Sequence, residues 1–235
     1  MHTDELTHLG HLGTATLDVK GRMPWSSNAT FLVDLVVDGT AVGQAVYKPL
    51  RGERPLWDFE PGLHRRETAA YRLSAAMGLG IVPPTIVRDG PYGEGSVQWF
   101  VDADHRHHYF TIFESRPELH DRLRAVALFD VVANNTDRKS GHVLVAGDDI
   151  WAIDNGLCFS TEFKLRTVIW EFGGEPISDT MRSALESLVA EVPAAITELL
   201  DPAEVDAMAA RAAMVLETGV LPVDHTGHRY PWPLV

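Results

Sequence analysis

Two aspartates, Asp137 and Asp154, stand where their carboxylates could act together. Asp137 follows the apolar stretch "FDVVANNT", Asp154 follows "IWAI", and two strand-like runs joined by a glycine turn lie between them. The turn would bring the carboxylates close, and their repulsion is tolerable when a divalent cation lies between them. One carboxylate near an attacking hydroxyl and one on a metal that bridges ATP phosphates suits phosphoryl transfer. The simpler interpretation is that Asp137 caps a turn and Asp154 ends a strand.

The elements that must position these aspartates are mainly strands in the first hundred residues and mainly helices after them. Alternating and β-branched segments predict strands over 13–21, 29–50 with a hairpin turn at Asp38 and Gly39, 81–90 and 95–102. Apolar residues at helical spacing predict helices over 61–80, 116–135, 178–192, 193–200 and 202–219. We therefore predict an α+β fold with two lobes. Its β-rich N-terminal lobe would span residues 1–101, and its helical C-terminal lobe would span residues 102–235.

Composition excludes several kinds of partner. The 20 basic and 33 acidic residues give a formal net charge of -13, which opposes contact with nucleic acid or an anionic membrane. A single cysteine excludes an intrachain disulfide framework and fits a reducing compartment. The sequence shows no targeting pattern and no apolar run of about 18 residues. We expect a cytoplasmic protein that binds no nucleic acid and has no stable membrane anchor.

The segments around the two aspartates are "NTDR" at 135–138 and "AIDNGLCF" at 152–159. Together they resemble the catalytic and metal-binding segments of the phosphatidylinositol 3- and 4-kinase superfamily, most closely the type II phosphatidylinositol 4-kinases. In the first lobe, "WSSNATFLV" is similar to that family's phosphate loop, "AVYKP" to its ATP-lysine strand and "VQWFVD" to its hinge. The chain also resembles a family of actinobacterial kinase-like proteins of about this size.

The resemblance implies that the α+β fold is a compact, two-lobed, atypical protein-kinase-like one, and it implies a role for each matching residue. Asp137 would orient or deprotonate the acceptor hydroxyl, and Asp154 would bind Mg²⁺. Lys48 would contact the α- and β-phosphates, and Glu67 on the helix at 61–80 would hold Lys48 in place. Arg138 would either neutralise charge near the transferred phosphate or brace the loop.

A second set of residues would bind ATP through polar groups of a loop and through the backbone of the hinge. They are Ser26, Ser27, Asn28, Gln98, Phe100 and Val101. An ordinary turn before a strand explains the first three nearly as well. A buried strand is compatible with the same role for the last three.

His142 departs from the family pattern. Those kinases have an asparagine here, whose amide oxygen binds a second metal. Imidazole is a poor ligand for Mg²⁺ and a good one for softer metals. Three outcomes stay open: one metal at Asp154, a preference for Mn²⁺ with His142 as a ligand, or lost catalysis with nucleotide binding retained.

The residues therefore predict an ATP-dependent phosphotransferase that uses ATP with Mg²⁺ or Mn²⁺. It would transfer the γ-phosphate to a hydroxyl of a soluble acceptor, either a protein Ser/Thr or a small metabolite. A phosphoinositide is less favoured, because the chain is acidic and lacks the cysteine cluster of the lipid kinases. The same residues are also compatible with a nucleotide-binding pseudokinase that has a regulatory role, and with an AMP transferase.

Overall fold

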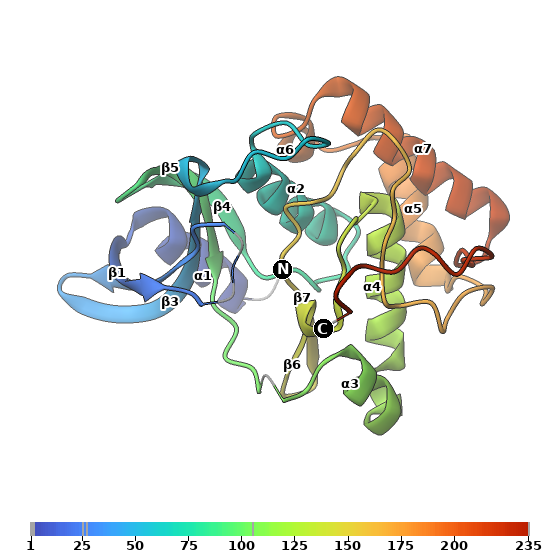
Figure 1. The fold of residues 1–235 in the computed structure, drawn as a ribbon, viewed down its shortest axis with the longest axis horizontal. Coiled ribbons are helices and arrows are strands. Elements are labelled where there is room, and N and C mark those ends of the chain that lie inside the picture. Colours follow the sequence, from blue (N-terminus) through green and yellow to red (C-terminus); the bar gives the residue numbers. More distant parts are fainter. Residues whose placement is uncertain (1–2, 25, 27, 105, 235) are drawn as a thin grey trace.

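The first half of the chain forms one antiparallel sheet in the computed structural model, which describes residues 3–24, 26, 28–104 and 106–234. The strand order is β1-β2-β3-β5-β4 (Figure 1). The strands are β1 (Thr16–Arg22), β2 (Phe31–Val37), β3 (Thr40–Pro49), β4 (Thr85–Gly90) and β5 (Gly93–Trp99). Because β3 is hydrogen-bonded to β2 on one side and β5 on the other, it is held firmly in the middle of the sheet.

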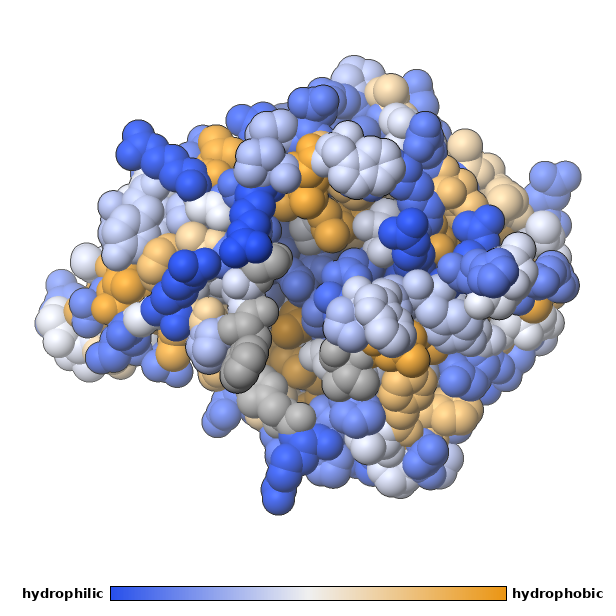
Figure 2. All heavy atoms as spheres, in the orientation of Figure 1, coloured by the Kyte–Doolittle hydropathy of each residue, from blue (hydrophilic) through white to orange (hydrophobic). Residues whose placement is uncertain are grey.

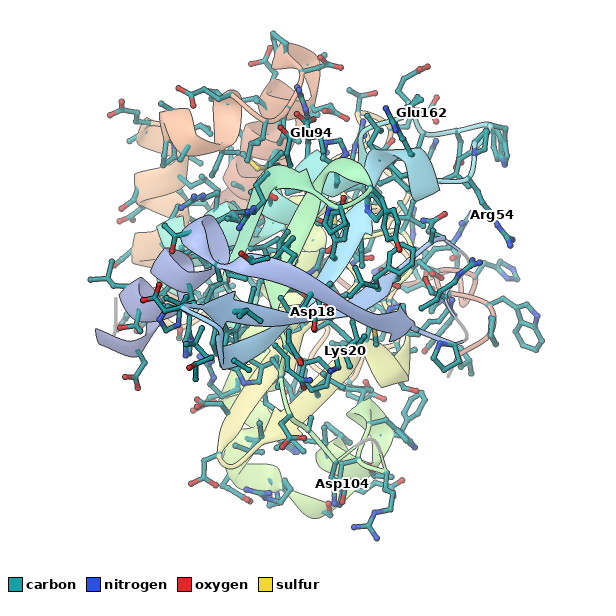
Figure 3. All side chains as sticks on the ribbon, turned by 90° about the vertical axis from the view of Figure 1, so that its left-hand side faces the viewer. Asp18, Lys20, Arg54, Glu94, Asp104 and Glu162 are labelled. Carbon is teal, nitrogen blue, oxygen red and sulfur yellow. The ribbon has the colours of Figure 1, made fainter. Side chains whose placement is uncertain are left out.

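The predicted hairpin turn between β2 and β3 is confirmed. Asp38 and Gly39 have φ of 49° and 76°, the left-handed backbone that an Asp-Gly turn of this type requires. The edge strand β1 carries exposed charges, and Lys20 pairs with Asp34 of β2 at 3.1 Å. Figure 3, which faces the sheet, shows Asp18 and Lys20 on this edge strand. Such charges oppose edge-to-edge association of sheets.

Helix α1 (Thr3–Thr14) covers one face of the sheet and was not predicted. Its residue Leu12 packs with Val33, Leu35 and Tyr47, and its His8 ring stacks on Trp99 at a centroid distance of 3.7 Å. The segment indicates a helix only weakly because two glycines and two histidines interrupt its apolar pattern. The opposite face of β3, which carries Lys48, is thereby left toward the rest of the molecule.

The remaining elements are helical except for one hairpin. They are α2 (Leu63–Ala76), α3 (Tyr109–Ser115), α4 (His120–Ala133), β6 (Val143–Ala146), β7 (Asp149–Ala152), α5 (Asp179–Ala190), α6 (Ala194–Thr197) and α7 (Pro202–Thr218). Helix α4 begins later than predicted because Pro117 opens a short 3₁₀ turn before it. The prediction over 193–200 is confirmed only in part, since α6 is a single turn, and α3 was not predicted.

The main core surrounds α4. Leu123, Val126, Phe129 and Val132 of this helix are fully buried among residues of α2, β6, β7, α5 and α7. In Figure 1 the sheet lies on the left, the helices α4, α5 and α7 lie on the right, and the β6–β7 hairpin lies between them. The α+β prediction is confirmed. The lobe boundary at residue 101 stays a prediction, although β5 ends at Trp99 and the next helix begins at Tyr109.

The C-terminal tail returns to the middle of the molecule. No helix or strand occurs over its described residues 221–234, as the sequence predicted. The carbonyl of Leu234 accepts a hydrogen bond from Ser140 N at 2.8 Å, and that of Arg229 accepts one from Thr167 N at 3.1 Å. The end of the tail therefore lies beside the loop that follows Asp137, in front of β6 and β7 in Figure 1. Within the described ranges, no helix combines the length and the apolar character needed to cross a membrane.

Candidate functional site

Lys48 extends from the central strand toward the helical part. Along β3, Ala45 and Tyr47 point to the buried face under α1, so the alternating positions Val46 and Lys48 point to the other face. There the Lys48 ammonium forms an ion pair with Glu67 of α2. Glu67 is only 3% exposed, so this ion pair is largely shielded from water. Its geometry depends on the position of α2, which carries Glu67. The predicted contact between these two residues is present.

Asp154 meets the same ammonium from the opposite side. Its Oδ1 lies 2.8 Å from Lys48 Nζ, and its side chain is 53% exposed, the most open of the three. The positive charge of Lys48 holds the pKa of Asp154 below its ordinary range. Burial disfavours the charged form of Lys48. The neighbouring carboxylates of Asp154 and Glu67 outweigh this effect and raise the pKa of Lys48. Lys48 and Asp154 are therefore both charged at neutral pH. Figure 2 shows this face of the molecule hollowed between the sheet on the left and the helices on the right.

Glu67 also fixes the loop that carries Asp154. Its Oε2 accepts a hydrogen bond from Asn155 N at 3.1 Å. A Cβ at Gly156 would lie 3.3 Å from Glu67 Oε1, so glycine permits the loop to approach α2 closely. Asp154 itself has φ of 57°, a left-handed conformation that Asp tolerates better than most residues. Strand β3, helix α2 and the end of β7 are thus tied together through one carboxylate.

Arg138 is a bracing residue in the structure. Its side chain is 0% exposed and forms an ion pair with Asp130 of α4 at 3.0 Å. It also donates to the carbonyl of Ile153 at 2.6 Å and to the side chain of Asn155. These buried contacts favour the second role that the sequence left open, a brace for the loop. A catalytic role for Arg138 stays a prediction.

Asp137 lies at the surface of the loop that Arg138 braces. Its side chain is 28% exposed, and its Oδ2 lies 3.0 Å from the ammonium of Lys139. Its backbone N–H donates to the side chain of Asn135 at 2.9 Å. Lys139 therefore pairs with one carboxylate oxygen of Asp137.

His142 connects the two aspartates. Its Nδ1 lies 3.0 Å from the carbonyl oxygen of Asp137, and its Nε2 lies 3.5 Å from Oδ2 of Asp154. Burial lowers the pKa of His142, and the charge of Asp154 only partly opposes this effect. The two residues predicted as metal ligands thus lie side by side.

The residues present fit a divalent cation held partly by a nucleotide. No group of three or more His, Cys, Asp or Glu side chains capable of holding a metal occurs in the described part of the chain. Asp154 and His142 would supply two ligands. Mg²⁺ and similar ions in kinases take one or two protein ligands and complete their shell with phosphate oxygens and water. The site therefore suits a cation that arrives with ATP, and it does not suit a structural metal.

The predicted phosphate loop lies between β1 and β2. Ser26 Oγ bonds to Thr30 Oγ1 at 2.8 Å, and Asn28 Oδ1 accepts a hydrogen bond from Arg54 N at 2.9 Å. Ser27 lies outside the described residues. Within the described part of this loop, no bond joins it to Lys48 or Asp154. The structure thus joins Lys48, Glu67, Asp154, His142 and Asp137 through contacts, and it shows none from the described loop residues to this set.

The predicted hinge includes Gln98, near the end of β5, and the two residues after this strand, Phe100 and Val101. Several of their hydrogen-bonding groups already have partners within the protein. The Gln98 side chain is buried and donates to Thr85 at 2.9 Å. The Phe100 N–H donates to the carbonyl of Gln44 at 3.0 Å, so it is not available to adenine. Among described residues, the N–H of Val101 has no acceptor, which makes Val101 the best placed of the three.

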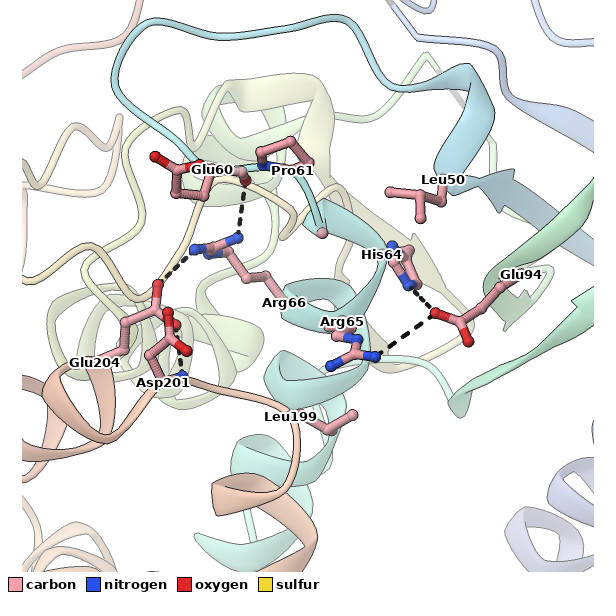
Figure 4. Close-up of a pocket in the computed structure, with 11 residues that line it drawn as sticks. Leu50, Glu60, Pro61, His64, Arg65, Arg66, Glu94, Leu199, Asp201 and Glu204 are labelled. Carbon is pink, nitrogen blue, oxygen red and sulfur yellow. Dashed lines mark hydrogen bonds and ion pairs between the residues drawn. The ribbon is translucent and has the colours of Figure 1, made fainter.

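A separate cavity of about 270 Å³ lies at the start of α2. Its polar residues pair with one another: Arg66 with Glu204 at 2.6 Å and His64 with Glu94 at 3.0 Å (Figure 4). These contacts join α2 to α7 and to β5. We interpret them as part of what holds α2, and with it Glu67, in position.

Two residues to which the sequence patterns assign no role prove important to the site. Asp130 is a fully buried acid in the middle of an apolar helix, and that placement was itself a signal that it must have a charged partner. Asn155 lies within the "IDNG" segment and is fully buried, where it bonds Arg138, Glu67 and the carbonyl of Ala152. Both residues position others and reach no solvent.

Glu67→Gln tests the link between α2 and Lys48. Glutamine keeps an oxygen for Asn155 N but removes the charge that holds the Lys48 ammonium. We expect ATP turnover to fall by about tenfold to a hundredfold. Steady-state kinetics with ATP as the varied substrate would measure the loss, and a melting curve would show whether the fold is retained.

The matched control is Glu186→Gln, an exposed glutamate on α5. This variant should keep wild-type turnover. Equal turnover in Glu67→Gln and Glu186→Gln would contradict the role of Glu67.

Comparisons with known proteins agree on the fold. No protein-family model matches the chain. It is 38% identical to "Protein Rv2133c" of Mycobacterium tuberculosis, over 94% of this chain and 93% of the other. The crystal structure of the Golgi casein kinase with Mn and ADP bound is similar with a TM-score of 0.56 and 16% identity, over 97% of this chain and 80% of that one. Hydra Fam20 with sugar has a TM-score of 0.59 and 13% identity, over 96% and 94%. The predicted kinase-like fold is confirmed.

Proposed function

Because this chain belongs to the same family as protein Rv2133c of Mycobacterium tuberculosis and has a kinase-like fold, we propose that it is an ATP-dependent phosphotransferase. The acceptor is a hydroxyl of a soluble molecule, either a protein Ser/Thr or a small metabolite. The observation that carries the proposal is the unbroken set of contacts from Glu67 through Lys48 and Asp154 to His142. Positioned opposite charges of this kind are what phosphoryl transfer requires, since its catalysis is mainly orientation and charge neutralisation.

Each residue then has a defined task. Lys48 turns from Asp154 to the α- and β-phosphates, while Glu67 keeps its ammonium in the site. Asp154 holds the divalent cation, which when bound neutralises charge on the phosphates. Asp137 orients the acceptor hydroxyl and takes its proton, and Lys139 fixes the rotamer of that carboxylate.

Two further observations support this proposal. The segments "NTDR" and "AIDNG" resemble those of phosphatidylinositol 3- and 4-kinases, which use the corresponding aspartates for phosphoryl transfer. One structural neighbour, the Golgi casein kinase, is described with Mn and ADP bound. A soluble acceptor is favoured over a lipid because the chain carries a net charge of -13, which opposes an anionic bilayer.

Labelled ATP tests the proposal. The purified protein would be incubated with ATP labelled at the γ- or the α-phosphate, with Mg²⁺ or Mn²⁺, and with protein extract or pooled hydroxylated metabolites as acceptors. Transfer of label from the γ position alone, absent in Asp154→Asn, is the expected result. Label transferred from the α position would identify an AMP transferase instead. ADP binding in an equilibrium titration without transfer of either label would identify a pseudokinase.

A further inference from the structure

We propose that His142 and Asp154 form a nitrogen–oxygen chelate that selects Mn²⁺ over Mg²⁺ as the cation bound with the nucleotide. The inference deepens the proposed function and rests on it, because the cation arrives with ATP. It concerns position 142, where this chain has a histidine and the kinases it resembles have an asparagine with an oxygen ligand. Its basis is the orientation of the imidazole ring and the atoms that face each ring nitrogen.

The shorter of two contacts at Nδ1 assigns the ring proton of His142 to this nitrogen. It lies 3.0 Å from the carbonyl oxygen of Asp137, and a carbonyl oxygen can only accept a hydrogen bond. A second contact, from the N–H of Lys139, is longer at 3.4 Å. A neutral ring with its proton on Nδ1 presents a lone pair at Nε2. Metal-binding histidines are commonly oriented in this way, by donation from the other nitrogen to a backbone carbonyl.

The lone pair of Nε2 faces a second acceptor. Oδ2 of Asp154 lies 3.5 Å from Nε2, and the other oxygen, Oδ1, is held by Lys48. An imidazole lone pair and a carboxylate oxygen at this separation are placed to share one cation. Adjacent ligands of one octahedral ion, each at about 2.1 Å, lie about 3 Å apart, so a small closure would suffice. The Asp154 side chain is 53% exposed, so the pair is accessible to an ion.

The donor atoms decide which ion is preferred. Mg²⁺ favours oxygen ligands and is bound weakly by imidazole, whereas Mn²⁺ accepts imidazole together with phosphate oxygens and water. Zn²⁺ usually takes four ligands with several nitrogen or sulfur donors, which two side chains do not supply. A histidine at this position therefore favours Mn²⁺. An asparagine would offer an oxygen ligand in place of the nitrogen.

Pulsed electron paramagnetic resonance tests the nitrogen ligand directly. Mn²⁺ would be added with ADP to the wild-type chain and to His142→Asn. The wild type should show nitrogen-14 modulation from a coordinated imidazole, and His142→Asn should lose it. Competition between Mn²⁺ and Mg²⁺, followed by the free Mn²⁺ signal, should show a preference for Mn²⁺ that falls about tenfold or more in the variant. His225→Asn, an exposed histidine in the tail, is the matched control and should behave as the wild type does.

The outcomes separate this inference from the proposed function. Bound Mn²⁺ without nitrogen modulation in the wild type would overturn the chelate and leave the phosphotransferase intact. If ADP fails to bind, the proposed function fails, and the spectrum with Mn²⁺ alone then decides on the chelate. Retained modulation in a folded His142→Asn protein would show that another nitrogen is the ligand, which also overturns the inference.

Discussion

Asp154→Asn is expected to reduce phosphoryl transfer by about a thousandfold or more. The substitution keeps the shape of the side chain and an oxygen for Lys48, but it removes the negative charge that would hold the cation. Lys48 retains its second partner, Glu67, so no unpaired charge results. Initial rates with γ-labelled ATP would measure the effect, and the melting temperature should change by only a few degrees.

The control for this variant lies on the same hairpin. Asp149 begins β7 and is exposed, so Asp149→Asn removes the same charge without touching the site. It should transfer phosphate at the wild-type rate. If Asp154→Asn transfers phosphate as fast as Asp149→Asn, then Asp154 has no part in the reaction.

Arg138→Met is expected to give the largest loss of stability. The fully buried Asp130 would lose its cationic partner and keep uncharged donors such as the Thr167 hydroxyl. Breaking one side of a buried ion pair typically costs about 3–5 kcal/mol of unfolding free energy. The carbonyl of Ile153 and the side chain of Asn155 would each also lose a donor. Urea unfolding at neutral pH would measure the change.

Two further variants make the result specific. Arg166→Met removes an exposed arginine from the neighbouring segment and should leave the unfolding free energy within about 0.5 kcal/mol of the wild type. Asp130→Asn combined with Arg138→Met should be more stable than Arg138→Met alone, because no buried charge is left unpaired. A double variant as unstable as the single one would show that the pair contributes through packing and not through charge.

Much of the site could be predicted from local patterns. The alternation along β3 places Lys48 on the face opposite Ala45 and Tyr47, and the segments around Asp137 and Asp154 indicate loops that follow a helix and a strand. The Asp38–Gly39 turn could be predicted because only a few residue types adopt its backbone. Helix α1 was missed because its stability comes from packing on the sheet, and its own sequence favours a helix only weakly.

The role of Arg138 could not be decided from the sequence. A loop arginine beside a catalytic aspartate suits either a phosphate contact or a brace, and the choice depends on what encloses it. The structure encloses it between Asp130 of α4 and the loop after β7. The sequence also could not show that the N–H of Phe100 donates to the carbonyl of Gln44, because Gln44 lies on a different strand, β3.

The sequence by itself determined which residues carry charge and which face of each strand or helix they occupy, because those properties follow from side-chain type and from periods of 2.0 and 3.6 residues. Tertiary structure alone decided which faces meet. Lys48 and Asp154, 106 positions apart, touch because α2 packs on both the sheet and α4, and α4 packs on β7. A nonlocal contact of this kind depends on the sum of many packing interactions, and no short stretch of sequence contains that sum.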